Sequence, residues 1–352
     1  MVRRCATPID SMLFWRRCPI DIAKRAFKLW LECQVNFAPR ISPTRNKMHK
    51  RNMTLRSFLQ STLVLALAIN SVSNCFSDEA VKLFQVQVQR DIEFAEIDGV
   101  KLLLNLHLPA GVEKPPLVMY IHGGAWLAGD RNSCGTCWVA KHGYAVASIE
   151  YRMSDEALYP AQIHDCKGAL RWLRAHQDEY GYDATRVVVA GASAGGQLAA
   201  LMGTTGGVDS LEGTTAGHAD QSTLVQGVID YYGATDFIMR SKNQPDKTEE
   251  PNGTVYKLFG GSVSDNIGLA RSASASAFVD SSDPPILIFH GDKDPVVQLT
   301  QSARMKVVYE ENKLDALLYI EMGKGHGWKR TDVETKRVLD FLQKCFQEPT
   351  EE

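Results

Sequence analysis

The sequence predicts an α/β fold whose central sheet is mostly parallel, with an antiparallel hairpin at its N-terminal side and helices on both faces. Three observations lead to this prediction. Short runs of β-branched and apolar residues recur between residues 86 and 320, as they do in buried parallel strands. Amphipathic segments separate most of these runs, which is typical of connecting helices. The first two runs instead alternate between apolar and polar side chains and are joined by Asp98-Gly99, a type I′ hairpin signal.

The composition is that of an ordinary globular protein. The chain has 352 residues, a formal net charge of −2 and 8 cysteines. A charge this close to zero argues against a nucleic-acid partner, and so few cysteines do not form a disulfide scaffold. No period of 20 to 50 residues repeats, and no shift in composition divides residues 80–346. We therefore predict one domain over this range and leave the oligomeric state open.

The N-terminal part of the chain differs from the rest. Residues 1–52 are basic and show neither a helix nor a strand period, so we interpret them as an extension. We expect that Met1 is a mis-assigned start and that translation starts at Met48 or Met53. Residues 53–77 combine a basic start, a short apolar run and small polar residues, which indicates a secretory signal peptide. An unusually long basic region or an uncleaved anchor are the alternatives. The expected location is secreted or periplasmic, with no stable membrane insertion after cleavage.

The elements follow one another with recognisable boundaries. Pro160 opens a long amphipathic helix that reaches about His176, because its fixed φ suits the first helical turn. The Gly- and Thr-rich stretch 204–222 is expected to be a surface loop, and the charged stretch 240–252 a mobile loop or small lid. The predicted strands are 86–94, 101–108, 117–121, 144–149, 186–190, 225–232, 285–290 and 316–320. The other predicted helices are 131–141, 197–202, 299–312 and 331–346.

A strand, a glycine-rich turn and a helix meet at Ser193. The sequence Gly191-Ala192-Ser193-Ala194-Gly195 follows a β-branched run and precedes an apolar helix, which is the context of a nucleophile elbow. Gly191 and Gly195 lack Cβ atoms, so the strand and the helix can cross closely. A glycine-rich turn without catalytic function is the alternative. We predict Ser193 as the nucleophile.

A serine hydroxyl needs a base within hydrogen-bond reach and a third group that orients the base. His326 is the predicted base, because it follows the predicted strand 316–320 and has a glycine on either side. Since functional loops lie beyond the carboxyl ends of parallel strands, His326 should lie near Ser193. His290 ends a strand, and we expect it to be a buried, hydrogen-bonded residue.

The loop after the predicted strand 285–290 offers two candidates for the acid, Asp292 and Asp294. Asp294 is preferred because Pro295 fixes the backbone behind it, whereas Asp292 is better placed to accept hydrogen bonds from turn amides. Asp292 remains open. In either case the order along the chain is serine, aspartate, histidine, which is the order of the α/β-hydrolases.

The oxyanion of an acyl-transfer reaction needs preorganised donors. We predict the backbone N–H of Ala194, next to the nucleophile, and those of Gly124 and Ala125 in the stretch His122-Gly123-Gly124-Ala125. This stretch has the place of the glycine-rich oxyanion loop of esterases. A glycine turn that merely ends a strand is the alternative. The chemistry calls for no metal and no organic cofactor.

Taken together, these motifs resemble the α/β-hydrolase superfamily, in its esterase/lipase branch with feruloyl-esterase-like and hormone-sensitive-lipase-like enzymes. The resemblance covers nearly all of residues 80–346. It rests on His122-Gly123-Gly124-Ala125-Trp126, Tyr151-Arg152, Tyr159-Pro160, Gly191-Ala192-Ser193-Ala194-Gly195-Gly196, His290-Gly291-Asp292-Lys293-Asp294-Pro295-Val296-Val297 and Gly325-His326-Gly327. It implies an α/β-hydrolase fold and supports Asp294 as the acid. The lipase-type acid loop is absent, which favours the feruloyl-esterase-like group.

The expected function is that of a secreted serine hydrolase acting on a small-molecule or polysaccharide-linked carboxylic ester. A peptidase similar to prolyl oligopeptidases but without the propeller, and a non-catalytic binding protein with this fold, are the alternatives. Cys134 and Cys137 form a C-x-x-C, either as a tight local disulfide or as two helix cysteines.

Overall fold

The computed structural model describes residues 82–347, and within them eight strands form one sheet in the order β1-β2-β4-β3-β5-β6-β7-β8. β1 pairs with β2 and β2 with β4 in antiparallel fashion, while every other pair is parallel. The predicted sheet and its leading hairpin are therefore confirmed. The strands are β1 Val86–Ile97, β2 Val100–Pro109, β3 Pro116–Ile121, β4 Ala145–Ile149, β5 Asp183–Ala192, β6 Gly227–Tyr231, β7 Ile286–Gly291 and β8 Ala316–Glu321.

The hairpin turn has the predicted chemistry. Asp98 and Gly99 have φ values of 52° and 82°, so both central residues occupy the left-handed region that a type I′ turn requires. The predicted N-terminal extension (1–52) and signal peptide (53–77) lie outside the described residues. No helix between residues 82 and 347 is long and apolar enough to cross a membrane.

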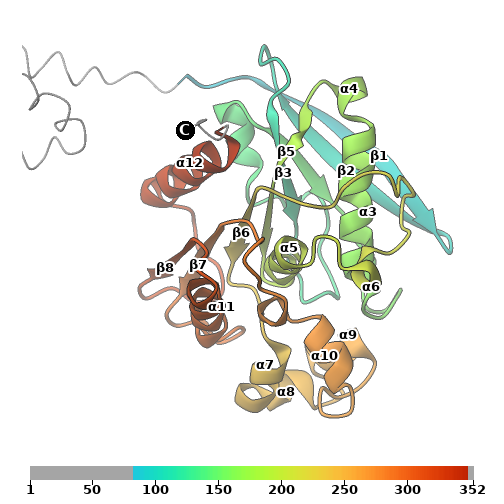
Figure 1. Ribbon diagram of the computed structural model, residues 1–352, viewed down its shortest axis with the longest axis vertical. Coiled ribbons are helices and arrows are strands. Elements are labelled where there is room, and N and C mark those ends of the chain that lie inside the picture. Colours follow the sequence, from blue (N-terminus) through green and yellow to red (C-terminus); the bar gives the residue numbers. More distant parts are fainter. Residues whose placement is uncertain (1–81, 348–352) are drawn as a thin grey trace, which may run out of the picture. The chain divides into compact units, whose positions relative to one another are not determined.

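Helices surround the sheet, and a group of short ones, α7 to α10, gathers at one end of it (Figure 1). The helices are η1 Cys137–His142, α3 Ala161–Ala175, α4 Gln177–Tyr180, α5 Ala194–Thr204, α6 Asp209–Glu212, α7 Phe237–Asn243, α8 Pro245–Thr248, α9 Thr254–Phe259, α10 Ile267–Ser272, η2 Ala275–Ala277, α11 Thr300–Glu311 and α12 Asp332–Phe346, where η denotes 3₁₀ helix.

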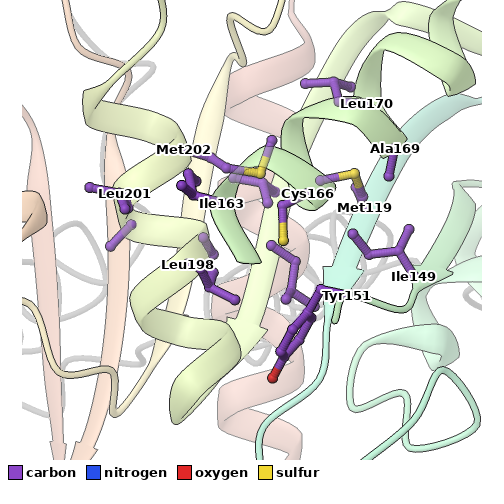
Figure 2. Packing of buried hydrophobic residues seen from close by; sticks show 14 of the residues in the cluster. Met119, Ile149, Tyr151, Ile163, Cys166, Ala169, Leu170, Leu198, Leu201 and Met202 are labelled. Atoms are coloured by element: carbon purple, nitrogen blue, oxygen red, sulfur yellow. The ribbon is translucent and has the colours of Figure 1, made fainter. Parts of the chain in front are cut away.

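Two hydrophobic cores lie on opposite faces of the sheet, because alternate residues of each buried strand point to opposite sides. Met119 belongs to the core that also contains residues of α3 and α5, whereas its neighbour Val118 belongs to the core beneath α12. Figure 2 shows the first core, where Ile163 and Cys166 of α3 lie near Leu198 of α5. Both faces of the central strands are thus covered, which explains their uninterrupted apolar sequences.

The prediction of a helix over residues 131–141 is wrong. The chain runs through turns until Cys137 and then forms only the 3₁₀ helix η1. The amide of Asn132 donates to the side chain of Asp130 at 2.7 Å, and this local bond competes with helix formation. A disulfide joins Cys134 to Cys137, and a Cβ on Gly135 would lie 2.9 Å from the hydroxyl of Tyr120.

The stretch 204–222 is more than the predicted surface loop, since it contains α6 and is attached to α3 by buried charges. The ammonium group of Lys167, which is fully buried, contacts Glu212 at 2.7 Å. Arg171 donates to the carbonyl of Gly217 at 3.1 Å and to that of Thr215 at 3.1 Å. Composition alone does not show such a network, because the same polar residues also suit an exposed loop.

The stretch 240–252 is likewise not the predicted loop, since α7 and α8 occupy most of it. Asp236 caps α7 by accepting the amide of Met239 at 2.8 Å, which stabilises a start that the sequence analysis missed. Arg240, Gln244 and Thr248 are buried, so one side of this charged segment packs against the domain.

Candidate active site

Ser193 lies on a strained turn between β5 and α5. Its φ and ψ are 56° and −116°, an unusual conformation for a residue other than glycine. The close approach depends on two glycines. A Cβ on Gly191 would lie 2.1 Å from the carbonyl oxygen of Gly195, and one on Gly195 would lie 2.1 Å from that of Ile121. The predicted reason for glycine at both positions is therefore seen in the packing, and Ser193 is left partly exposed.

His326 connects Ser193 to Asp294. Its Nδ1 lies 2.7 Å from Oδ2 of Asp294 and its Nε2 lies 2.8 Å from Oγ of Ser193. Since an ionised carboxylate only accepts hydrogen bonds, the proton on the ring belongs to Nδ1, and Nε2 is free to accept the proton of the serine hydroxyl. This is the geometry that a serine nucleophile, its base and an orienting acid require.

Asp294 is buried, but its carboxylate accepts several hydrogen bonds from protein groups. Burial favours its neutral form, yet hydrogen bonds from His290, His326 and the Val297 amide outweigh this effect and hold the pKa of Asp294 well below its usual value. The amides of Val296 and Val297 donate to Oδ1 at 2.8 Å and 3.0 Å. Asp294 is therefore ionised at neutral pH.

Asp292, the alternative acid, lies elsewhere. It accepts a hydrogen bond from the backbone amide of Gly323, as expected of a turn residue. The structure thus brings Asp294, and not Asp292, against His326. His290 is buried as expected, with Nε2 at 2.8 Å from the carbonyl of Val297 and 3.4 Å from Oδ2 of Asp294. The contact between His290 and Asp294 was not predicted from the sequence, although His290 directly precedes the loop that contains the acid.

The predicted oxyanion donors divide into two kinds. Ala125 and Ala194 line the cavity beside Ser193, and their N–H groups have no acceptor within residues 82–347. Gly124 does not line this cavity, although its N–H likewise has no acceptor within residues 82–347; its φ is 128° and its carbonyl accepts the amide of Leu127 at 3.0 Å. Ala125 has φ of 58°, in the left-handed region that favours glycine, so alanine carries backbone strain at the position where esterases of this type have glycine. The three roles remain predictions.

A cavity of about 200 Å³ opens beside Ser193. One part of the cavity is apolar, and the other part contains the cations Arg240 and Lys247. These two residues were not predicted as site residues, because they lie in the stretch 240–252 that we interpreted as a mobile loop or small lid. The remaining lining residues of the cavity are Trp126, Ala234, Arg240, Lys247, Thr254, Pro295, Val296 and Val297. Trp126 lines the cavity and also belongs to the hydrophobic core, since it is 2% exposed and its Nε1 donates to Gln197.

A second, smaller hollow of about 100 Å³ lies on the side of His326. Tyr232 and Trp328 line it, and the ring of Tyr232 lies 4.7 Å from that of His326. Ala192, the residue before the nucleophile, also contributes to its wall. No group of three or more side chains suited to bind a metal ion occurs between residues 82 and 347.

Comparison with known proteins identifies a family. The sequence model of the BD-FAE family matches residues 104–308, more than half of the chain. Among curated proteins, esterase LipC of Mycobacterium tuberculosis is 29% identical over 62% of this chain and 54% of its own length. Esterase LipQ of the same organism is 28% identical over 65% of this chain and 55% of its own. The chain thus spans about half the length of these curated relatives.

Solved structures agree on the fold. A truncated carbohydrate esterase from gut microbiota is 27% identical, with a TM-score of 0.67, over 76% of this chain and 98% of its own. A bifunctional GH43-CE protein of Bacteroides eggerthii is 28% identical, with a TM-score of 0.66, over 77% of this chain and 39% of its own. Together with the sheet order, these similarities confirm the predicted α/β-hydrolase fold.

Proposed function

Because the chain belongs to the BD-FAE family of α/β-hydrolases, we propose that it hydrolyses carboxylic esters through an acyl-enzyme intermediate on Ser193. The observation that carries this proposal is the line of hydrogen bonds from Ser193 through His326 to Asp294. The named relatives LipC and LipQ are esterases, and the similar structure with a TM-score of 0.67 is described as a carbohydrate esterase.

Acylation begins when Oγ of Ser193 attacks the ester carbonyl and its proton passes to Nε2 of His326. The negative charge that develops on the carbonyl oxygen is stabilised by the N–H groups of Ala125 and Ala194, with Gly124 as the third predicted donor. Asp294 stabilises the imidazolium that forms. His326 then protonates the leaving alcohol, the bond from carbon to this oxygen breaks, and the acyl group stays on Ser193.

Deacylation repeats these steps with water. His326 takes a proton from a water molecule, whose oxygen attacks the acyl carbon, and then returns the proton to Oγ of Ser193. The acid leaves and the free enzyme is restored. We propose a small-molecule or polysaccharide-linked ester as the substrate, and a secreted or periplasmic location with residues 53–77 as the signal peptide. The description of one similar structure as a carbohydrate esterase supports the proposed substrate.

The test compares wild type with Ser193→Ala on p-nitrophenyl acetate, butyrate and octanoate, methyl ferulate and a proline-linked p-nitroanilide. We expect turnover of esters by the wild type and a loss of at least about 10³-fold in kcat for the variant. Turnover of the anilide alone would identify a peptidase instead. Wild type without activity on any substrate would favour the non-catalytic alternative, and ester turnover that survives in the variant would contradict the mechanism.

A further inference from the structure

The cavity beside Ser193 contains an arginine without a carboxylate partner. Arg240 is 2% exposed, and its Nη2 donates to the carbonyl of Val296 at 3.0 Å. Nε and Nη1 have no acceptor in the part of the chain that the structure describes, and only Nε is completely covered. Nη1 is therefore the atom through which Arg240 can meet a molecule in the cavity that it lines.

An unpaired charge of this kind is unfavourable unless something pairs with it. No carboxylate lies within 4.0 Å of the Arg240 guanidinium among residues 82–347. Burial lowers the pKa of Arg240 to about 10, against the opposing pull of Asp246 and Asp294, so it remains protonated at neutral pH. Asp246 is engaged by Lys247 at 2.9 Å, and Asp294 by His326 at 2.7 Å.

The position of the cavity shows which half of an ester it would hold. The leaving alcohol must receive its proton from His326, so it leaves on the side of this residue, whose ring lies 4.7 Å from that of Tyr232 in the wall of the second hollow. Ser193 and the predicted oxyanion donors Ala125 and Ala194 line the cavity with Arg240, and none of the three lines the second hollow. The cavity is therefore assigned to the acyl group.

We infer that this cavity binds acyl groups that end in a carboxylate, and that Arg240, assisted by Lys247, pairs with that carboxylate. The preferred substrates are monoesters of short dicarboxylic acids. At about 30 Å³ for each water-sized group, a cavity of about 200 Å³ holds about six or seven non-hydrogen atoms. A glutaryl group places about this number beyond its ester carbonyl. The inference rests on the proposed function, because it specifies the substrate of the same site.

A purely structural role for Arg240 is the competing explanation. Arg240 and Gln244 both donate to the carbonyl of Val296, at 3.0 Å and 3.1 Å, and so hold the loop that follows Asp294. Such a role would affect charged and neutral esters equally. A role in binding would affect only the ester that carries the carboxylate. The two explanations therefore predict different ratios of kcat/KM between the charged and the neutral ester.

The experiment compares monomethyl glutarate with methyl 5-methylhexanoate, which has nearly the same shape but no charge. Methanol release gives kcat/KM for the wild type, Arg240→Gln and Lys242→Gln. The last variant is a matched control, because it removes a cation from the same helix at an exposed position that does not line the cavity. We expect the wild type and the control to prefer the glutarate ester by about 10- to 100-fold, and Arg240→Gln to lose this preference.

Calorimetry on Ser193→Ala with the same two esters measures binding without turnover. Tighter binding of the glutarate ester, lost in the double variant Ser193→Ala/Arg240→Gln, supports the inference even if the proposed function fails. Equal or weaker binding of the glutarate ester overturns it, as does an equal fall of both rates in Arg240→Gln. Hydrolysis of the neutral ester without a preference for the charged one overturns this inference alone and leaves the esterase function standing.

Discussion

Replacing Asp294 with asparagine tests the acid assignment most sharply. The amide oxygen of asparagine can still accept the amides of Val296 and Val297, so the loop should keep its shape. The change removes the charge next to His326 and places an NH₂ group or a neutral oxygen against Nδ1. The imidazolium that forms during catalysis loses its counter-charge, and the ring is no longer held with its proton on Nδ1.

The expected loss follows from the geometry. Two unit charges 2.7 Å apart attract by about 6 kcal/mol at an effective dielectric constant of about 20. Each 1.36 kcal/mol changes a rate tenfold, which gives about 10⁴-fold. The His326 side chain is 20% exposed, and water recovers part of the lost stabilisation. We therefore expect kcat to fall by about 10³- to 10⁴-fold while KM changes little.

The assay is the steady-state hydrolysis of p-nitrophenyl butyrate at neutral pH, with Asp292→Asn as the matched control. Asp292 carries the same charge in the same loop but only accepts the amide of Gly323, so its variant should stay within about threefold of wild type. Thermal unfolding should show both variants folded. A collapse of activity in Asp292→Asn together with a mild effect in Asp294→Asn would refute the assignment.

Two further predictions concern stability. Glu212→Gln leaves the buried Lys167 without its counter-charge and should destabilise the protein by about 3–5 kcal/mol in urea unfolding. Because hydrogen bonds and the charge of Lys167 lower the pKa of Glu212 despite its burial, the wild-type advantage should be complete at neutral pH. It should disappear as the pH falls below the usual range of a glutamate and through the lowered pKa of Glu212, and a constant difference would contradict this account. Gly195→Ala should lower the melting temperature and activity, since its Cβ would collide with the carbonyl of Ile121. Gly268→Ala has free space and should stabilise by about 0.4–1 kcal/mol, so a similar loss in both would contradict the packing argument.

Much of the fold was predictable because buried parallel strands consist almost wholly of apolar residues. β7 and residues 187–192 of β5 are examples, since their sequences allow few other structures. The position of Ser193 was predictable for a similar reason, because glycine at 191 and 195 is required by a close crossing of backbones. In these cases a local constraint determines both sequence and structure.

Other features depend on contacts between distant residues and were missed or left open. The sequence favours Asp294 as the acid without excluding Asp292, because the contact with His326 depends on how two loops fold over each other. Arg240 lies in a charged stretch that looks exposed, and its burial depends on the carbonyl of Val296, far away in the sequence. The ion pair between Lys167 and Glu212 could not be predicted for the same reason, because charged residues of a buried ion pair look the same in the sequence as charged residues of a solvated loop.

Covalent labelling tests the central claim most directly, that Ser193 is a nucleophile activated by His326. The protein is treated with a fluorophosphonate, and the modified peptide is located by mass spectrometry in the wild type, Ser193→Ala and His326→Ala. We predict one label on Ser193 in the wild type, none at this position in Ser193→Ala, and labelling slowed by at least about 10³-fold in His326→Ala. A label on another serine, or an unchanged rate in His326→Ala, would contradict this account.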